Sequence, residues 1–148
     1  MMDTSIHSVD LFRHLVGEVV GAACAVHTFH PAIQGLEDTS TLLLQAENGA
    51  VGVIEASWVT PHSANLIEVY GEGGAAVVDY NTGSNRFCLD GETTWTEVTV
   101  EKRDRFVVEL THFAAVVRGE AAPRVTGEDG LRAVEVLYQG YGNRIGNG

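Results

Sequence analysis

The chain has 148 residues, of which 45% are hydrophobic and 20% are charged. This composition is ordinary for a globular domain with a buried core, so we expect residues 1–148 to form a single domain. The formal net charge of −11 argues against binding to nucleic acid or to an anionic membrane, because both require clustered basic side chains. The sequence shows neither an apolar run of membrane-spanning length nor a basic-then-apolar leader, which favours a cytoplasmic location.

The spacing of polar residues at the start of the chain predicts a helix. Asp3, His7, Asp10 and His14 follow one another at intervals of four, three and four residues. They therefore share one face of a helix, which repeats every 3.6 residues. Gly17 suits the end of this helix in the left-handed conformation.

Asp3 and His7 are the candidate catalytic residues of this helix. A carboxylate that hydrogen-bonds to an imidazole fixes its tautomer and raises its basicity, which suits proton transfer near neutral pH. The alternative is structural, with Asp3 capping the helix and His7 half exposed. We interpret Asp10 as an anchor to a neighbouring loop and His14 as a favourable charge near the helix C-terminus.

Short segments rich in β-branched and apolar residues follow, separated by glycine-containing turns such as Asn48-Gly49 and Asp90-Gly91. Strands are expected over residues 18–29, 39–46, 50–59, 66–70, 75–79, 86–89 and 93–101. In the third of these, one face carries Gly52, Ile54, Ala56 and Trp58, and the other carries Val51, Val53, Glu55 and Ser57. Strands so closely connected favour antiparallel pairing, since parallel neighbours need long crossovers.

Two helices are expected at the end of the chain. The first, residues 104–118, carries an apolar stripe and ends at Gly119. The second begins near Thr126, with Asp129 in a capping-box position, and runs to about Ile145. The expected fold is therefore α+β: two layers, with a mostly antiparallel open sheet and helices covering one face. The opposite face, with Val51 and Val53, is then free to contact a partner subunit.

Four other groups of residues are candidates for a site or a disulfide. His27 and His30 point to opposite faces of an extended strand, so we reject a metal site and disfavour a metal-dependent hydrolase. Residues 71–74 contain three glycines but lead into another strand, so they form a turn and not a phosphate loop. Trp58 and His62 are weak substrate-binding candidates, because Trp offers an apolar wall and His a polar handle; core or interface packing is the alternative for Trp58. Cys24 and Cys88 lie in apolar segments without signs of secretion, so we expect two buried, reduced thiols.

Taken together, several segments resemble the C-terminal, substrate-side domain of the Gfo/Idh/MocA oxidoreductases, the family of glucose–fructose oxidoreductase and inositol dehydrogenase. These segments, in order along nearly the whole chain, are residues 3–11, 15–19, 37–38, 48–58, 67–74, 113, 119–120, 123 and 126–133. The resemblance implies an α+β domain that acts with an N-terminal Rossmann domain to oxidise or reduce a sugar, polyol or related compound with NAD or NADP. It also implies that Asp3 and His7 line the substrate site, where His7 takes the hydroxyl proton. The open sheet face is expected to form a dimer or a higher homo-oligomer.

The family's Rossmann glycine loop and its Glu-Lys-Pro segment have no counterpart in the sequence. Hydride transfer depends on the nicotinamide cofactor, so we expect the chain to bind no cofactor by itself and to be inactive alone. The first hypothesis is thus the substrate-binding and oligomerisation part of an NAD(P)-dependent oxidoreductase. The second is a stand-alone binding or dimerisation module derived from such an enzyme, which would not need Asp3 and His7.

Overall fold

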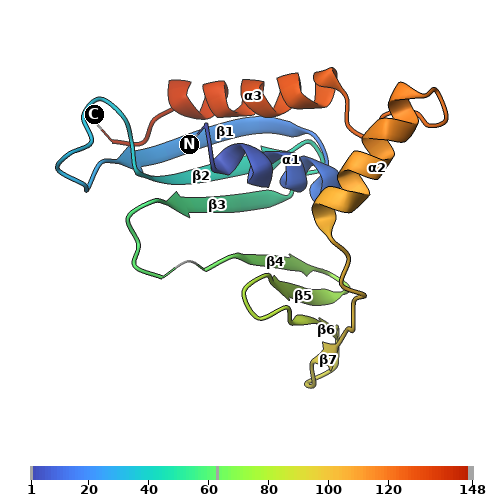
Figure 1. The fold of residues 1–148 in the computed structure, drawn as a ribbon. Coiled ribbons are helices and arrows are strands. Elements are labelled where there is room, and N and C mark those ends of the chain that lie inside the picture. The colour runs from blue at the N-terminus through green and yellow to red at the C-terminus, as the bar shows by residue number, and fades with distance from the viewer. Residues whose placement is uncertain (1, 63, 147–148) are drawn as a thin grey trace. The chain divides into compact units, whose positions relative to one another are not determined.

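The computed structural model describes residues 2–62 and 64–146, and within these it contains three helices and seven strands (Figure 1). In chain order the elements are α1 (Ser5–Val16), β1 (Val19–His27), β2 (Thr39–Ala46), β3 (Val51–Ser57), β4 (Leu66–Gly71), β5 (Gly74–Asp79), β6 (Asn85–Leu89), β7 (Thr96–Glu97), α2 (Arg105–Val117) and α3 (Gly127–Gly142). They divide into two compact units. The second unit runs from Pro61 to Ala122 and holds β4–β7 and α2, whereas the first holds α1, β1–β3 and α3. In the described part of the chain, no helix is both long and apolar enough to cross a lipid bilayer.

The sheet of the first unit consists of β1, β2 and β3 in that order, all antiparallel. The β2–β3 hairpin turns at Asn48 and Gly49, and Gly49 has a φ of +88°, which favours glycine. This hairpin and the span of β2 confirm the sequence-based prediction, because an Asn-Gly pair between two strand patterns is a strong hairpin signal.

One face of this sheet is covered by α1 and α3 (Figure 1). Alternate residues of β2 are buried from Ser40 to Ala46, as expected for a strand with one covered face. The core between helices and sheet consists of Val9, Ala22, Cys24, Leu42, Leu44, Ile54, Ala133, Val136 and Leu137. Burial of each larger aliphatic side chain is worth about 1.5–3 kcal/mol, so this core holds both helices on the sheet.

The first turn of α3 has the predicted capping box. The Asp129 backbone N–H donates to the Thr126 hydroxyl (3.4 Å), and the Thr126 N–H donates to the Asp129 carboxylate (2.7 Å). The predicted end near Ile145 was wrong, since α3 ends at Gly142. The chain then extends along β1, where the Ile145 N–H donates to the Cys24 carbonyl at 2.7 Å. This pairing covers part of an otherwise open sheet edge.

The second unit is a four-stranded antiparallel sheet in the order β4-β5-β6-β7, together with α2. Gly71 pairs with Gly74, so residues 71–74 form a hairpin turn, as predicted. Gly74 has a φ of +132°, and a Cβ there would lie 2.1 Å from the Cys88 carbonyl oxygen. The strand expected over residues 93–101 is reduced to Thr96–Glu97, because only these two residues pair with β6.

Helix α2 begins where the sequence predicted. Its N-cap Asp104 accepts hydrogen bonds from the backbone N–H groups of Phe106 and Val107, and Gly119 follows its last turn at a φ of +73°. None of its residues is buried. The predicted apolar stripe of Phe106, Leu110, Phe113 and Val117 is exposed.

These observations confirm the α+β class and the open antiparallel arrangement, and in the first unit both helices cover one sheet face. The division of the strands into two sheets was not indicated by the sequence. That residues 1–148 fold as a single domain stays a prediction.

Candidate functional site

The candidate site lies at the start of α1, whose first turn is fixed by two buried residues. Ser5 and Val9 are both fully buried, and the Ser5 hydroxyl lies 3.4 Å from the hydroxyl of Ser40 on β2. Residues four apart share a helix face, so this face of α1 is held against the sheet. His7 lies between these two positions and is exposed.

Asp3 lies in the turn that precedes α1 and is also exposed. The N-cap position is occupied by Thr4, so the alternative in which Asp3 caps the helix was wrong. No hydrogen bond joins Asp3 to His7 within the described residues, and their action as an acid/base pair stays a prediction. Both side chains are accessible to a ligand from solvent.

Trp58 is brought to the same end of α1. It follows β3, and its indole Nε1–H donates to the Thr4 hydroxyl oxygen at 3.1 Å. Its backbone N–H donates to the carbonyl oxygen of Asp38 at 2.8 Å. Trp58 nevertheless remains 69% exposed. Of the two predicted substrate-binding residues, Trp58 therefore lies beside Thr4, the residue that follows Asp3. His62 is an exposed residue of the second unit.

Asp38 supports the position of Trp58 and was not predicted from the sequence as part of this site. Its surface is 3% exposed, and its carboxylate accepts hydrogen bonds from the N–H groups of Phe29 (2.9 Å) and His30 (2.7 Å) and from the Thr39 hydroxyl (3.1 Å). Burial acts to raise the pKa of Asp38, but the hydrogen bonds outweigh burial and hold that pKa below its ordinary value. In the sequence, Asp38 is only an acidic residue directly before a strand, and this pattern does not indicate that its side chain is buried.

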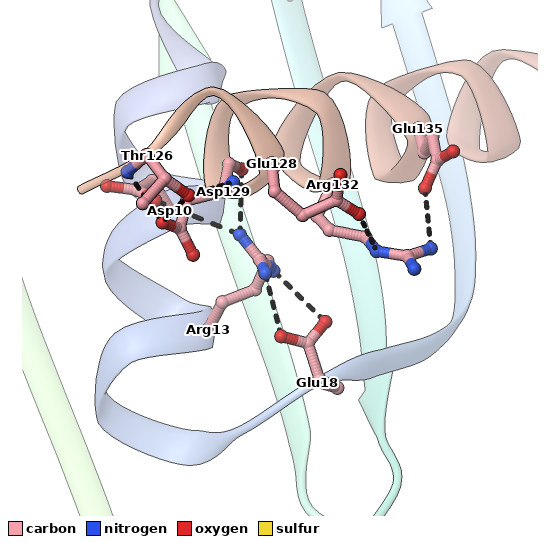
Figure 2. Close-up of polar contacts among 8 residues, drawn as sticks. All are labelled: Asp10, Arg13, Glu18, Thr126, Glu128, Asp129, Arg132 and Glu135. Carbon is pink, nitrogen blue, oxygen red and sulfur yellow. Dashed lines mark hydrogen bonds and ion pairs between the residues drawn. The ribbon is translucent and has the colours of Figure 1, made fainter.

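Asp10 does not anchor α1 to a neighbouring loop, so that prediction was wrong. Its carboxylate lies 3.9 Å from Arg13 of the same helix, and Arg13 makes the long-range contacts (Figure 2). The Arg13 guanidinium donates to both carboxylate oxygens of Glu18 (2.7 and 3.2 Å) and to the backbone carbonyl of Asp129 (2.9 Å). The hydrogen bond to Glu18 raises the pKa of Arg13 and lowers that of Glu18. His14 lies in the last turn of α1, where a positive charge is favourable.

The remaining candidates have structural partners. The ring of His27 packs on Phe29, with ring centroids 4.3 Å apart, and His30 Nδ1 accepts a hydrogen bond from the Ala32 N–H. Among residues 2–62 and 64–146, no three His, Cys, Asp or Glu side chains are grouped as metal ligands. Cys24 and Cys88 are both free; Cys24 is buried and Cys88 partly so.

A cleft of about 470 Å³ opens beside the C-terminal end of β1. Its polar lining includes His27, Thr28, Glu37 and Arg144. Neither Asp3, His7 nor Trp58 lines it, so the cleft is separate from the candidate site.

The uncovered face of the first unit's sheet is apolar at its centre. Leu43 on β2 pairs with Val53 on β3, and Val51 lies two residues before Val53 on the same face. Val51 and Val53 are 66% and 63% exposed. The predicted separation of the two faces is thus confirmed within β3, whereas Trp58 follows the end of this strand and is exposed.

Residues 1–77 match the family model described as the GFO/IDH/MocA C-terminal domain. The chain is 28% identical to a D-apiose dehydrogenase of Paraburkholderia graminis, over 94% of this chain and 41% of that protein. It is 29% identical to a myo-inositol 2-dehydrogenase of Thermotoga maritima, over 93% of this chain and 44% of that protein. Its fold is similar to that of a UDP-N-acetylglucosamine 3-dehydrogenase from Acidithiobacillus ferrooxidans, with a TM-score of 0.86, 23% identity and coverage of 97% and 46%. The chain thus spans less than half the length of the relatives that it matches.

Proposed function

Because the chain belongs to the family of GFO/IDH/MocA C-terminal domains, we propose that it is the substrate-binding and oligomerisation part of a cytoplasmic NAD(P)-dependent oxidoreductase. The substrate is a sugar, a polyol or a related compound. The observation that carries this proposal is the exposure of Asp3 and His7 at the fixed start of α1, beside Trp58. Each of these residues is accessible, and the start of α1 is held on the sheet by the buried Ser5 and Val9.

His7 is the proton acceptor in this proposal. A hydroxyl group of the substrate loses its proton to an unprotonated ring nitrogen of His7 as the carbon that bears it is oxidised. Imidazole is the side chain most often used for such transfer at neutral pH. Asp3, four residues before His7, supplies a carboxylate that can orient the imidazole and stabilise its charged form.

The glycine-rich turn of the chain does not fit the phosphates of a nicotinamide cofactor. A dinucleotide is held where a glycine loop leaves a strand and opens a helix, whereas residues 71–74 join two antiparallel strands. In a complete enzyme, a nicotinamide cofactor bound by another domain would supply the hydride acceptor. We therefore propose that a separate Rossmann domain is required and that this chain alone is inactive.

The test is to join the chain to the cofactor-binding part of the Paraburkholderia graminis relative and to measure reduction of NAD and NADP. The substrate panel begins with D-apiose and myo-inositol, which are named for the relatives. We expect turnover of at least one sugar or polyol, and a loss of kcat of about 10²–10⁴ in Asp3→Asn and His7→Gln, because general acid–base catalysis is worth that much. His14→Gln, at the other end of α1, is the matched control and should retain activity. Absence of turnover across the panel would contradict the proposal.

A second candidate function is a stand-alone dimerisation module, favoured by the exposed Val51 and Val53 on the uncovered sheet face. In that case Asp3→Ala with His7→Ala would leave self-association and biological effect unchanged, and the joined enzyme would show no turnover.

A further inference from the structure

The side chain of Trp58 combines two properties. The residue is 69% exposed, yet the only polar group of its indole, the Nε1–H, is already bonded to the Thr4 hydroxyl at 3.1 Å. A tryptophan has no other hydrogen-bonding atom in its side chain. What the ring offers a ligand is therefore the flat carbon face alone.

The position of this ring is held from two sides. The Trp58 backbone N–H donates to the Asp38 carbonyl oxygen at 2.8 Å, and Asp38 is itself 3% exposed. The Ser57 hydroxyl lies 3.0 Å from the Thr39 hydroxyl and accepts from the Val59 N–H at 3.2 Å. A contact surface fixed before the ligand arrives costs less entropy to use than a mobile one.

The hydroxyl that accepts from the indole belongs to Thr4, which directly precedes the helix that carries the proposed proton acceptor His7. Thr4 has helical backbone angles, with φ −102° and ψ −48°. Thr4 and His7 are three residues apart, and residues at this spacing are neighbours on a helix surface. A ligand lying on the Trp58 ring at Thr4 is thus within one helical turn of His7.

We propose that Trp58 is a stacking platform that selects substrates with a rigid apolar C–H face, namely cyclic sugars and cyclitols, over open-chain polyols. The inference rests on the proposed function and names the substrate class of the same site. In a saturated ring with mostly equatorial hydroxyls, the axial C–H bonds form a weakly positive face, which complements the negative face of an aromatic ring. An open-chain polyol has no preformed face and loses torsional entropy when it is straightened against the ring.

The test compares cyclic ligands with open-chain ligands of similar size. Myo-inositol and sorbitol have the same number of carbons and hydroxyl groups. Methyl xylopyranoside and xylitol form a second pair, in which the ring oxygen and the methoxy oxygen of the pyranoside replace two of the hydroxyl groups of xylitol. Binding to the isotope-labelled chain is measured by NMR titration in a Trp95→Phe background, which leaves Trp58 as the only tryptophan because the chain has two. Its fluorescence then provides a second signal.

We expect the cyclic member of at least one pair to bind about tenfold more tightly, the scale of one aromatic contact. Trp58→Ala should abolish this preference and Trp58→Phe should retain most of it. Thr4→Val, which removes the indole acceptor, should reduce the preference, whereas Thr4→Ser should not. Thr4 makes no capping hydrogen bond in α1, so this pair of variants does not remove a helix cap.

The outcomes separate the two proposals. Binding that is equal for cyclic and open-chain ligands and unchanged in Trp58→Ala would overturn the platform while leaving the proposed function intact. Failure of every ligand to bind the folded chain would contradict substrate binding itself, and the platform with it.

Discussion

Asp38 carries a charge in a place that is almost closed to solvent, and the surrounding backbone explains why. Besides the Thr39 hydroxyl, the donors to its carboxylate are the N–H groups of Phe29 and His30, which belong to the loop between β1 and β2. The sequence shows an acidic residue before a strand but cannot show these donors, because the path of the loop is set by tertiary contacts. His7 is the opposite case, since its place in the first turn of α1 followed from spacing alone. The start of α1 at Ser5, and not at Asp3, depends on burial of Ser5 against Ser40.

Tyr141 gives a prediction at the residue scale. Burial and its hydrogen bond to the Glu37 carboxylate raise the pKa of Tyr141 from 10.0 to about 12. The folded state therefore holds this proton more tightly than the unfolded state does. This contribution to stability is complete below pH 10.0 and is lost as the pH rises to about 12.

Urea unfolding as a function of pH checks this prediction. The free energy of unfolding should fall between pH 10.0 and about 12, and Tyr141→Phe should remove this part of the fall because the variant has no proton to lose. Tyr138→Phe is the matched control, since Tyr138 lies in the same helix and is exposed. Identical pH profiles for the wild type and Tyr141→Phe would contradict the account.

At the scale of elements, local signals predicted local structure. The hairpin at Gly49, the capping box at Thr126 and the alternation along β3 each depend on a few neighbouring residues, and all were confirmed. The end of α3 and the length of β7 depend on distant partners. Residues 143–145 leave the helix to pair with β1. Strand β7 is short because only Thr96 and Glu97 pair with β6. No pattern of neighbouring residues in the sequence predicts the pairing with β1 or the short pairing with β6.

Arg13 joins α1 to α3 and to the segment between α1 and β1, which gives a prediction at this scale. Its side chain is 7% exposed and binds Glu18 and the first turn of α3 (Figure 2). Arg13→Ala should lower the free energy of unfolding by about 1.5–3 kcal/mol, the usual range for hydrogen bonds that involve a charged group. Arg132→Ala is the control: Arg132 also contacts two carboxylates, but its side chain is 53% exposed, and the cost should be about 0–1 kcal/mol. Equal costs in chemical denaturation would refute the role given to Arg13.

At the scale of the whole molecule, the uncovered sheet face predicts self-association. Val51 and Val53 are exposed beside Leu43 on this face, and in a two-fold dimer each residue enters the interface twice. We expect a homodimer or a higher homo-oligomer in light scattering, with Val53→Lys weakening association roughly a hundredfold or more because two charges replace two apolar contacts. Val125→Lys is the control, because Val125 is 64% exposed but lies outside the sheet. If the wild-type chain is monomeric at all concentrations tested, the prediction that this sheet face forms an interface is wrong.

The central claim is that a substrate hydroxyl is deprotonated at the start of α1. The most direct measurement is a crystal structure of the chain joined to a cofactor-binding domain, with a sugar or polyol bound. The account predicts a substrate oxygen within about 2.6–3.2 Å of a ring nitrogen of His7, with Asp3 on the same side and the carbon face of the substrate on Trp58. A substrate held instead in the cleft lined by Thr28, Glu37 and Arg144, away from His7, would contradict it.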